Sequence, residues 1–238
     1  IRVWLPPSYD GQRRFPVLYL HDGQNLFDGI DGLYGCWYMD RSMQALDAEG
    51  LSAILVGVDN SLERMGELCP PGQRLKSCER LLDEAGNEIE ATGELYARFV
   101  TEQLKPLIDS RYAALSDKAH TGIGGSSMGG LLSAYMALSR PDVYGRCLSF
   151  SPAFGLFGKR ALTKALSSCA VEKLTDSRFF FYAGGAGFEA GFTEYALAAD
   201  LLLRKKGVCS AALIDTRLPH HESAWAKYFP EAFRFLFS

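Results

Sequence analysis

Residues 122–130 form a glycine-rich stretch with one serine whose spacing suits a catalytic nucleophile. Gly125, Ser127 and Gly129 make the pattern G-x-S-x-G, in which the serine occupies a sharp turn between a strand and a helix. The small neighbours leave room for the strained backbone of such a turn. The turn also places the hydroxyl near the first backbone N–H groups of the helix, which stabilise negative charge. The pattern therefore predicts that Ser127 attacks a substrate and forms an oxyanion.

The segments on either side of this stretch have the character that the turn requires. Residues 120–124 predict a short strand, and residues 131–140 (LLSAYMALSR) predict a helix that ends before Pro141. No lysine follows the glycines, which argues against a phosphate-binding loop of the G-x-x-x-x-G-K-[ST] kind. A strand, a turn and a helix in this order favour a nucleophile over a plain glycine-rich connection.

A serine hydroxyl is a weak nucleophile at neutral pH and needs a general base within hydrogen-bond reach. Of the four histidines, only His220 and His221 follow the serine, as the order nucleophile, acid, histidine of α/β-hydrolases demands. They lie between the last expected strand and the last expected helix, at the edge of the sheet where ligands bind. The residues that follow lack the second histidine of H-E-x-x-H, so they do not indicate a zinc site. From the residues alone, either histidine can be the base.

An acidic residue must orient this histidine and stabilise its charged form. Glu189 follows an apolar segment at 179–183 and a glycine-rich loop at 184–187, so we expect it at the carboxyl edge of the sheet. Asp215 ends the strand before the histidines and is the alternative. Glu189 is the preferred acid.

The oxyanion needs two backbone donors. We expect the first from Met128, the residue after the nucleophile, and the second from the loop that follows an earlier strand. In that loop Gln24 is the preferred donor and Gly23 the alternative. The expected substrate contacts are His21, Asp22, Trp37 and Trp225.

Strands and helices are expected to alternate along the chain. Strands are predicted at 2–5, 15–20, 53–58, 120–124, 147–150, 179–183 and 209–215, and helices at 37–49, 94–108, 131–140, 159–169, 193–206 and 223–237. The last helix is expected to be interrupted at Pro230. This order predicts an α/β-hydrolase fold, with a mostly parallel central sheet and helices on both faces, as one domain over residues 1–238. The irregular residues 60–92 are expected to form a flap or insertion near the active site.

Composition narrows the choice of partners. A net charge of −3 without clusters of lysine or arginine argues against nucleic acid, and no apolar run is long enough to cross a bilayer. The six cysteines lack C-x-x-C spacing, so neither a zinc site nor a redox motif is indicated. Most of them lie in expected strands or helices, where a cysteine is usually a buried free thiol, and this favours reduced thiols and a cytoplasmic location. No feature of the sequence indicates an oligomeric state. Because residue 1 falls in an expected strand, we expect the natural chain to begin earlier.

Four segments together resemble a known family. They are GGSSMGG at 124–130, LHDGQNLFD at 20–28, YARF at 96–99, and His220 five residues before Trp225. The chain is similar to the putative esterase (esterase D-like) family of α/β-hydrolases. That group includes feruloyl and acetylxylan esterases of carbohydrate esterase family 1, siderophore esterases and antigen 85 mycolyltransferases.

The resemblance implies a serine carboxylic-ester hydrolase with a triad of Ser127, His220 and Glu189. It selects His220, because the family's histidine precedes a tryptophan at this spacing, and its mycolyltransferase branch supports Glu189 and Gln24. It implies no cofactor or metal, and a small-molecule or carbohydrate-linked ester such as a feruloyl or acetyl ester. An acyltransferase with the same triad and a non-catalytic binding protein of the same fold are the alternatives.

Overall fold

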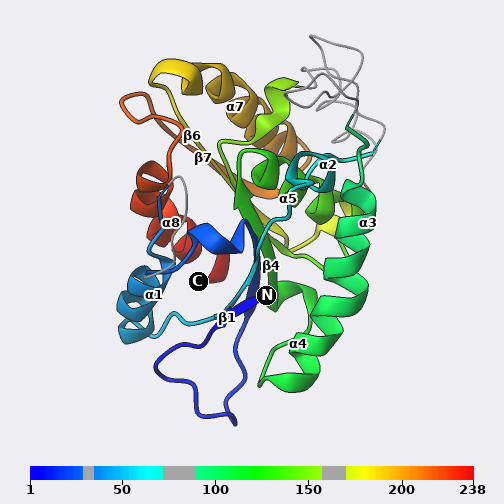
Figure 1. Ribbon diagram of the computed structural model, residues 1–238, viewed down its shortest axis with the longest axis vertical. Coiled ribbons are helices and arrows are strands. Elements are labelled where there is room, and N and C mark those ends of the chain that lie inside the picture. The colour runs from blue at the N-terminus through cyan, green and yellow to red at the C-terminus, as the bar shows by residue number, and fades with distance from the viewer. Residues whose placement is uncertain (29–34, 72–88, 157–169) are drawn as a thin grey trace.

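The computed structural model describes residues 1–28, 35–71, 89–156 and 170–238, and a twisted sheet runs through its centre (Figure 1). The strands are β1 (Arg2–Trp4), β2 (Val17–His21), β3 (Ile54–Val58), β4 (Thr121–Ser126), β5 (Arg146–Phe150), β6 (Arg178–Gly184) and β7 (Cys209–Asp215). Their order in the sheet is β1-β3-β2-β4-β5-β6-β7. Only the pairing of β1 with β3 is antiparallel, and the other neighbouring strands of this sheet run parallel. The carboxyl ends of β2 to β7 therefore meet at one edge.

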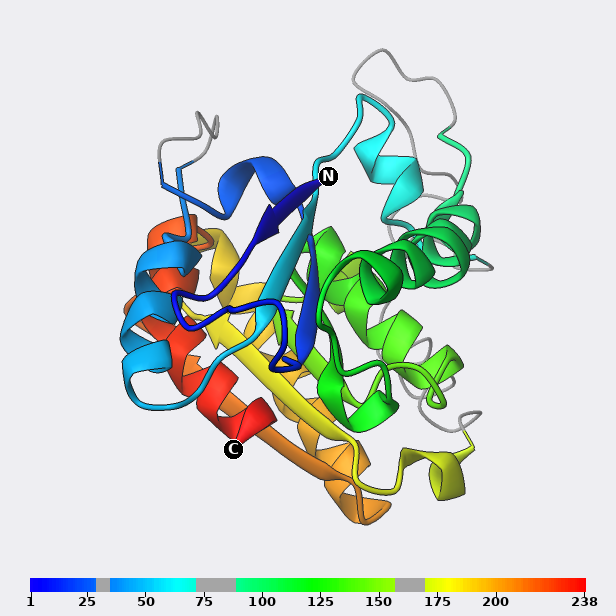
Figure 2. The same ribbon diagram turned by 90° about the horizontal axis from the view of Figure 1, so that it is seen from below.

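Helices cover both faces of the sheet (Figure 2). They are α1 (Met39–Ala48), α2 (Arg64–Glu67), α3 (Gly93–Arg98), α4 (Lys105–Arg111), α5 (Met128–Ser139), α7 (Ala190–Lys205) and α8 (Glu222–Phe237), and a π-helical segment, Phe99–Leu104, joins α3 to α4. The apolar sides of α1 and α8 pack on one face, and those of α3, α4, α5 and α7 pack on the other. No helix in the described ranges combines the length and apolar character that crossing a bilayer takes.

The alternation of side chains along β2 shows how the two core layers are divided. Val17 and Tyr19 belong to the layer under α3, α4, α5 and α7, whereas Leu18 and Leu20 belong to the layer under α1 and α8. Successive strand residues point to opposite faces, and both faces of this sheet are covered. A continuous apolar run is therefore what such a strand requires.

The observed elements confirm the predicted mostly parallel α/β architecture, with small shifts at the ends of elements. One prediction is wrong: α8 continues through Pro230 without interruption. A proline inside a helix removes one backbone hydrogen bond and costs roughly 3 kcal/mol. The buried Trp225, Phe229 and Phe233 keep this helix packed against the sheet, which offsets that cost. The helix predicted at 159–169 lies outside the described residues.

The expected flap over residues 60–92 is described only in part. Residues 60–71 contain the short helix α2, residues 89–92 lead into α3, and residues 72–88 lie outside the described ranges. The described portion contacts the loop that follows β2, because Asn60 and Arg64 both donate hydrogen bonds to Asp22.

Gly145 offers a test of how tightly the amino edge of the sheet is packed. Its N–H donates to the backbone oxygens of Lys118 (2.9 Å) and Thr121 (3.1 Å), and a Cβ placed on it would overlap the Lys118 oxygen and lie 2.9 Å from the Lys118 carbonyl carbon. We expect Gly145→Ala to lower the free energy of unfolding by roughly 1–3 kcal/mol, measured by urea denaturation. The control is Gly191→Ala in α7, where a Cβ meets nothing within 4 Å and helix propensity predicts a gain of roughly 0.5–1 kcal/mol. Equal effects of the two substitutions would contradict this description.

Candidate active site

Ser127 forms the sharp turn between β4 and α5 that the sequence predicts. Its backbone has φ 56° and ψ −120°, a conformation that non-glycine residues rarely adopt. The chain passes so close to itself that a Cβ on Gly125 would lie 3.1 Å from the carbonyl carbon of Gly129. The Ser127 N–H donates to the Phe150 oxygen at 2.9 Å. Ser127 is partly exposed, and its hydroxyl has no hydrogen-bond partner among the described residues.

His220 and Glu189, far apart in sequence, are in direct contact. Nδ1 of His220 is hydrogen-bonded to Oε2 of Glu189, whose side chain is completely buried. The other carboxylate oxygen accepts hydrogen bonds from the Gly184 N–H (2.8 Å) and from the Ser151 hydroxyl. Ser151 in turn accepts a hydrogen bond from Nε1 of Trp225 at 2.9 Å. This network holds the carboxylate, and with it the imidazole, in one orientation.

Glycines let the two loops that carry Glu189 and His220 approach each other. A Cβ on Gly184 would overlap the backbone oxygen of Leu218 and would lie 2.7 Å from Cγ of Glu189. The same Leu218 oxygen accepts hydrogen bonds from the N–H groups of Gly185 and Ala186, both at 3.1 Å. The loop after β6 is thereby fastened to the loop after β7.

The two alternative residues, His221 and Asp215, form hydrogen bonds with residues other than Glu189 and His220. His221 caps α8, with its Nδ1 accepting from the Ser223 N–H at 3.1 Å. Asp215 pairs with Arg217, at 2.9 and 3.0 Å, and accepts from the Tyr228 hydroxyl at 2.7 Å. The hydrogen bonds from Arg217, and then that from Tyr228, hold the pKa of Asp215 well below its usual range. Both alternatives thus have other partners.

The two expected oxyanion donors have unoccupied backbone N–H groups. Gln24 lies in a 3-10 turn, Gly23–Asn25, directly after β2, and Met128 is the first residue of α5. Among the hydrogen bonds between described residues, none has the N–H of Gln24 or Met128 as its donor. Gly23 itself is closely packed, since a Cβ there would lie 2.6 Å from Oδ1 of Asp59.

The four expected substrate contacts are buried rather than displayed. His21, Asp22, Trp37 and Trp225 have 2%, 7%, 2% and 4% of their surface exposed. Trp37 stacks on Phe150 at 5.3 Å between ring centroids, and Trp225 meets the ring of His220 edge-on at 5.1 Å. These side chains therefore pack against other residues of the site and expose little surface to a ligand.

His21 packs directly against the turn that holds Ser127. Its Cδ2 lies 3.1 Å from the position of a Cβ on Gly125, and its Nδ1 is hydrogen-bonded to the Tyr96 hydroxyl at 3.0 Å. Burial lowers the pKa of His21 to about 4 and raises the pKa of Tyr96 well above its ordinary value. Nε2 of His21 is buried without a partner among the described residues. The support behind the turn is therefore an uncharged pair of rings.

Several supporting residues were not expected from the sequence. Ser151 had one available signal, a polar residue at the carboxyl end of a predicted buried strand. Tyr96, Asn60 and Arg64 lie in segments whose pattern gives no indication of contact with the loop after β2. In the described ranges, no group of three or more potential ligand residues is placed to hold a metal ion.

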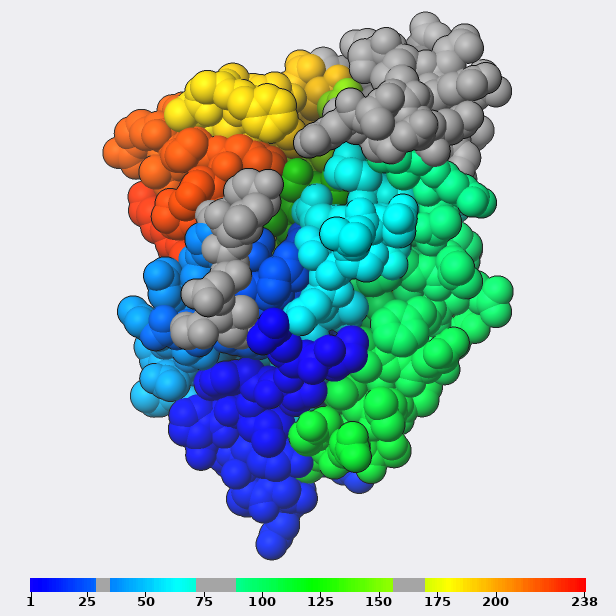
Figure 3. All heavy atoms as spheres, viewed as in Figure 1, coloured from blue at the N-terminus to red at the C-terminus, as the bar shows by residue number. Residues whose placement is uncertain are grey.

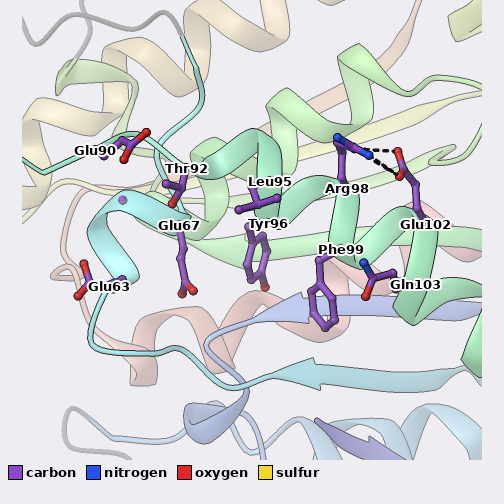
Figure 4. Close-up of a pocket in the computed structure, with 11 residues that line it drawn as sticks. Glu63, Glu67, Glu90, Thr92, Leu95, Tyr96, Arg98, Phe99, Glu102 and Gln103 are labelled. Carbon is purple, nitrogen blue, oxygen red and sulfur yellow. Dashed lines mark hydrogen bonds and ion pairs between the residues drawn. The ribbon is translucent and has the colours of Figure 1, made fainter.

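A separate cavity of about 420 Å³ opens between α2 and α3 (Figure 4). Glutamates supply much of its lining, at positions 63, 67, 90 and 102, and Arg98 pairs with Glu102 on its rim. Neither Ser127 nor His220 lines it. Tyr96, which does, connects this cavity to His21 behind the turn.

The sheet, the strand-to-helix serine turn and the hydrogen bond between the buried Glu189 and His220 together define an α/β-hydrolase with the features of a serine esterase. The chain belongs to the putative esterase family, whose model matches residues 1–234. The family resemblance and fold predicted from the sequence are confirmed, and the protein is a carboxylic ester hydrolase of the serine esterase class.

Comparisons with individual proteins agree with this family. The uncharacterized protein YbbA of Bacillus subtilis strain 168 is 26% identical over 249 residues, which cover 99% of this chain and 91% of that protein. An IroE-like serine hydrolase from Shewanella oneidensis is 21% identical with a TM-score of 0.73, over 99% of this chain and 74% of the other. A ferulic acid esterase is 16% identical with a TM-score of 0.68, over 99% and 90%. At such identities the two solved structures support the fold.

The burial of His21 predicts how the free energy of unfolding depends on pH. Its pKa is about 4 in the folded protein and about 6.5 when unfolded, so between these values the unfolded chain binds a proton that the native one does not. The free energy of unfolding should fall by about 3 kcal/mol from this group as the pH drops through that window. We expect His21→Asn to lose this part of the slope in urea denaturation between pH 7 and pH 4. Parallel pH profiles for the two proteins would contradict the assignment.

Proposed function

We propose that Ser127 is the nucleophile of this esterase, His220 its general base and Glu189 the acid that orients the base. The observation that carries the proposal is the hydrogen bond between the buried Glu189 and the partly exposed His220. Ser127 follows β4, Glu189 follows β6 and His220 follows β7, so all three come from the carboxyl edge of the sheet, where α/β proteins bind ligands.

The Glu189 contact determines which nitrogen of the imidazole does the chemistry. A carboxylate at Nδ1 favours the tautomer with the proton on that nitrogen, which leaves Nε2 unprotonated as the base. Nε2 takes the proton of Ser127 as the hydroxyl oxygen attacks the ester carbonyl. The imidazolium then protonates the departing alcohol, and the buried carboxylate of Glu189 stabilises the positive charge of the ring. In the second half, His220 removes a proton from water as the water oxygen attacks the acyl carbon. His220 then gives this proton to the Ser127 oxygen as the bond to the acyl group breaks, which releases the acid and restores the free serine.

The negative charge of the tetrahedral intermediate needs donors that are already in place. Met128 and Gln24 are the proposed pair, because each presents a backbone N–H without a partner among the described residues. Met128 is also at the N-terminus of α5, where the helix dipole favours an anion. Such preorganised donors lower the barrier without reorganising during the reaction.

Substitution of the three residues tests the proposal. Ser127→Ala and His220→Ala should each lower kcat/KM for a short-chain p-nitrophenyl ester by roughly 10⁴-fold or more. Glu189→Gln should lower it by roughly 10²- to 10⁴-fold, because the amide cannot stabilise the imidazolium.

The matched controls are His221→Ala and Asp215→Asn, which remove the alternative base and acid. Both should retain kcat/KM within about threefold, a change of under 1 kcal/mol in the barrier. A loss in His221→Ala as large as that in His220→Ala would transfer the role of base to the neighbour.

An exposed aromatic ring beside His220 supports an aromatic ester as the substrate. Phe188 is 75% exposed, and its ring centroid lies 5.5 Å from that of His220 and 5.1 Å from that of Phe192. An aromatic acid or alcohol gains both apolar burial and favourable ring contacts on such a surface. The name of one structural neighbour, a ferulic acid esterase, points the same way. We therefore favour feruloyl-type esters over acetyl esters as substrates. The proposal that a carbohydrate supplies the alcohol of the ester rests on the family resemblance.

Phe188→Ala tests this preference. We expect kcat/KM for methyl ferulate to fall roughly tenfold, the equivalent of about 1.4 kcal/mol of lost ring contact, and kcat/KM for an acetyl ester to stay the same. Leu201→Ala, which removes another exposed apolar side chain of the same region of sequence, is the control. An equal loss with both esters would remove the support for an aromatic subsite.

Product analysis with and without an added sugar separates hydrolysis from acyl transfer by the same residues.

A further inference from the structure

Asp22, in the loop after β2, adopts a left-handed backbone conformation. Its φ of 56° and ψ of 50° lie in the left-handed region, which aspartate tolerates better than most residues but adopts at a cost. It precedes Gly23 and Gln24, the residue proposed to donate a hydrogen bond to the oxyanion. The direction in which the N–H of Gln24 points therefore depends on this conformation.

A segment more than thirty-five positions later in the chain holds the Asp22 side chain. Nε of Arg64 donates to Oδ1 at 2.6 Å and a terminal nitrogen of Arg64 donates to Oδ2 at 2.8 Å. The side-chain amide of Asn60 adds a third hydrogen bond, to Oδ1, at 3.0 Å. A two-pronged arginine–carboxylate pair restricts orientation as well as distance.

The same segment also holds Gln24. The backbone N–H of Asn60 donates to Oε1 of Gln24 at 3.1 Å, so residues 60–64 contact the loop on both sides of Gly23. Figure 3 shows the segment of α2, in cyan, on the same face of the molecule as the N-terminal region in blue. These contacts lie outside the sheet and join the loop after β2 to the loop after β3 and to the first residue of α2.

The loop held in this way lies directly on the serine turn. Oδ2 of Asp22 is 3.6 Å, and Cβ of His21 is 3.1 Å, from the position of a Cβ on Gly129. On its other side, Gly23 is pressed against Asp59 and Gly57, with an ideal Cβ at 2.6 Å and 2.8 Å from their atoms. A small movement of Asp22 would therefore move the loop relative to Ser127.

We propose that Arg64 and Asn60 are positioning residues for transition-state stabilisation. Through their contacts with Asp22 and Gln24 they hold the loop after β2, so that the backbone N–H of Gln24 points at the developing oxyanion. The inference rests on the proposed function, in which Gln24 is an oxyanion donor. In this proposal both residues act through Asp22 and Gln24 and not by contact with the substrate. Their effect is on the chemical step, since a donor misplaced by a fraction of an ångström still permits substrate binding but stabilises the transition state less.

The first test compares kcat with KM in Arg64→Ala. Complete loss of an oxyanion donor lowers kcat roughly 10²- to 10³-fold, and a misplaced donor should lose part of this. We therefore expect kcat to fall roughly 10- to 100-fold, with KM changed by less than about threefold. The melting temperature should also fall, because the buried carboxylate of Asp22 loses its charged partner. Added guanidinium ion should restore part of kcat in Arg64→Ala. Arg98→Ala is the control, because it removes another arginine of this region, paired with the exposed Glu102, and should leave both constants unchanged.

The second test uses phenylboronic acid, whose tetrahedral adduct with the serine places an oxygen where the oxyanion forms. Its inhibition constant should rise in Arg64→Ala and Asn60→Ala by the factor by which kcat/KM falls. If Arg64→Ala does not fold, Arg64→Lys, which keeps the charge but not the two-pronged contact, is measured in the same way. Unchanged kcat and boronate affinity in these variants would overturn the inference while leaving the triad intact. Full turnover by Ser127→Ala would instead overturn the proposed function.

Discussion

The buried carboxylate of Glu189 is the interaction on which the arrangement at the sheet edge depends. A charge without access to water is tolerated only if hydrogen bonds replace the lost solvent. Here the donors come from β6 (Gly184), from the turn after β5 (Ser151) and from the loop after β7 (His220). Loss of His220 would leave Oε2 without a donor among the described residues, and loss of the Ser151 hydroxyl would leave Oε1 with the Gly184 N–H alone. Three loops are therefore held together by one side chain.

Aromatic packing extends this arrangement into the core. Trp225 donates to Ser151 and meets His220 edge-on, while Trp37 packs between Trp225 and Phe150. Because these rings are buried, the polar network rests on a close-packed base that permits few alternative positions. Rigidity of this kind is what a preorganised active site requires.

A second set of contacts organises the opposite side of the serine turn. Asp22, Arg64 and Asn60 hold the loop after β2, and the side chain of Asn25 donates to Glu222 at 3.3 Å in the first turn of α8. Burial raises the pKa of Glu222. This contact joins the loop after β2 to the segment that carries His220. The two halves of the candidate site are thus linked across the sheet edge.

The sequence by itself reduced the base to His220 or His221 and the acid to Glu189 or Asp215, and only the family resemblance selected His220. The sequence also determined the order of elements and the serine turn. These features follow from local rules: apolar runs make buried strands, glycines permit close approach, and parallel strands end at one edge. Only the tertiary structure decided that Ser151 holds Glu189, that Arg64 and Asn60 hold Asp22, and that Trp37 and Trp225 are buried rather than displayed. Such contacts join segments with no periodic relation in the chain, so their partners are chosen by how loops pack in three dimensions. Burial of a side chain likewise depends on what the rest of the chain places over it.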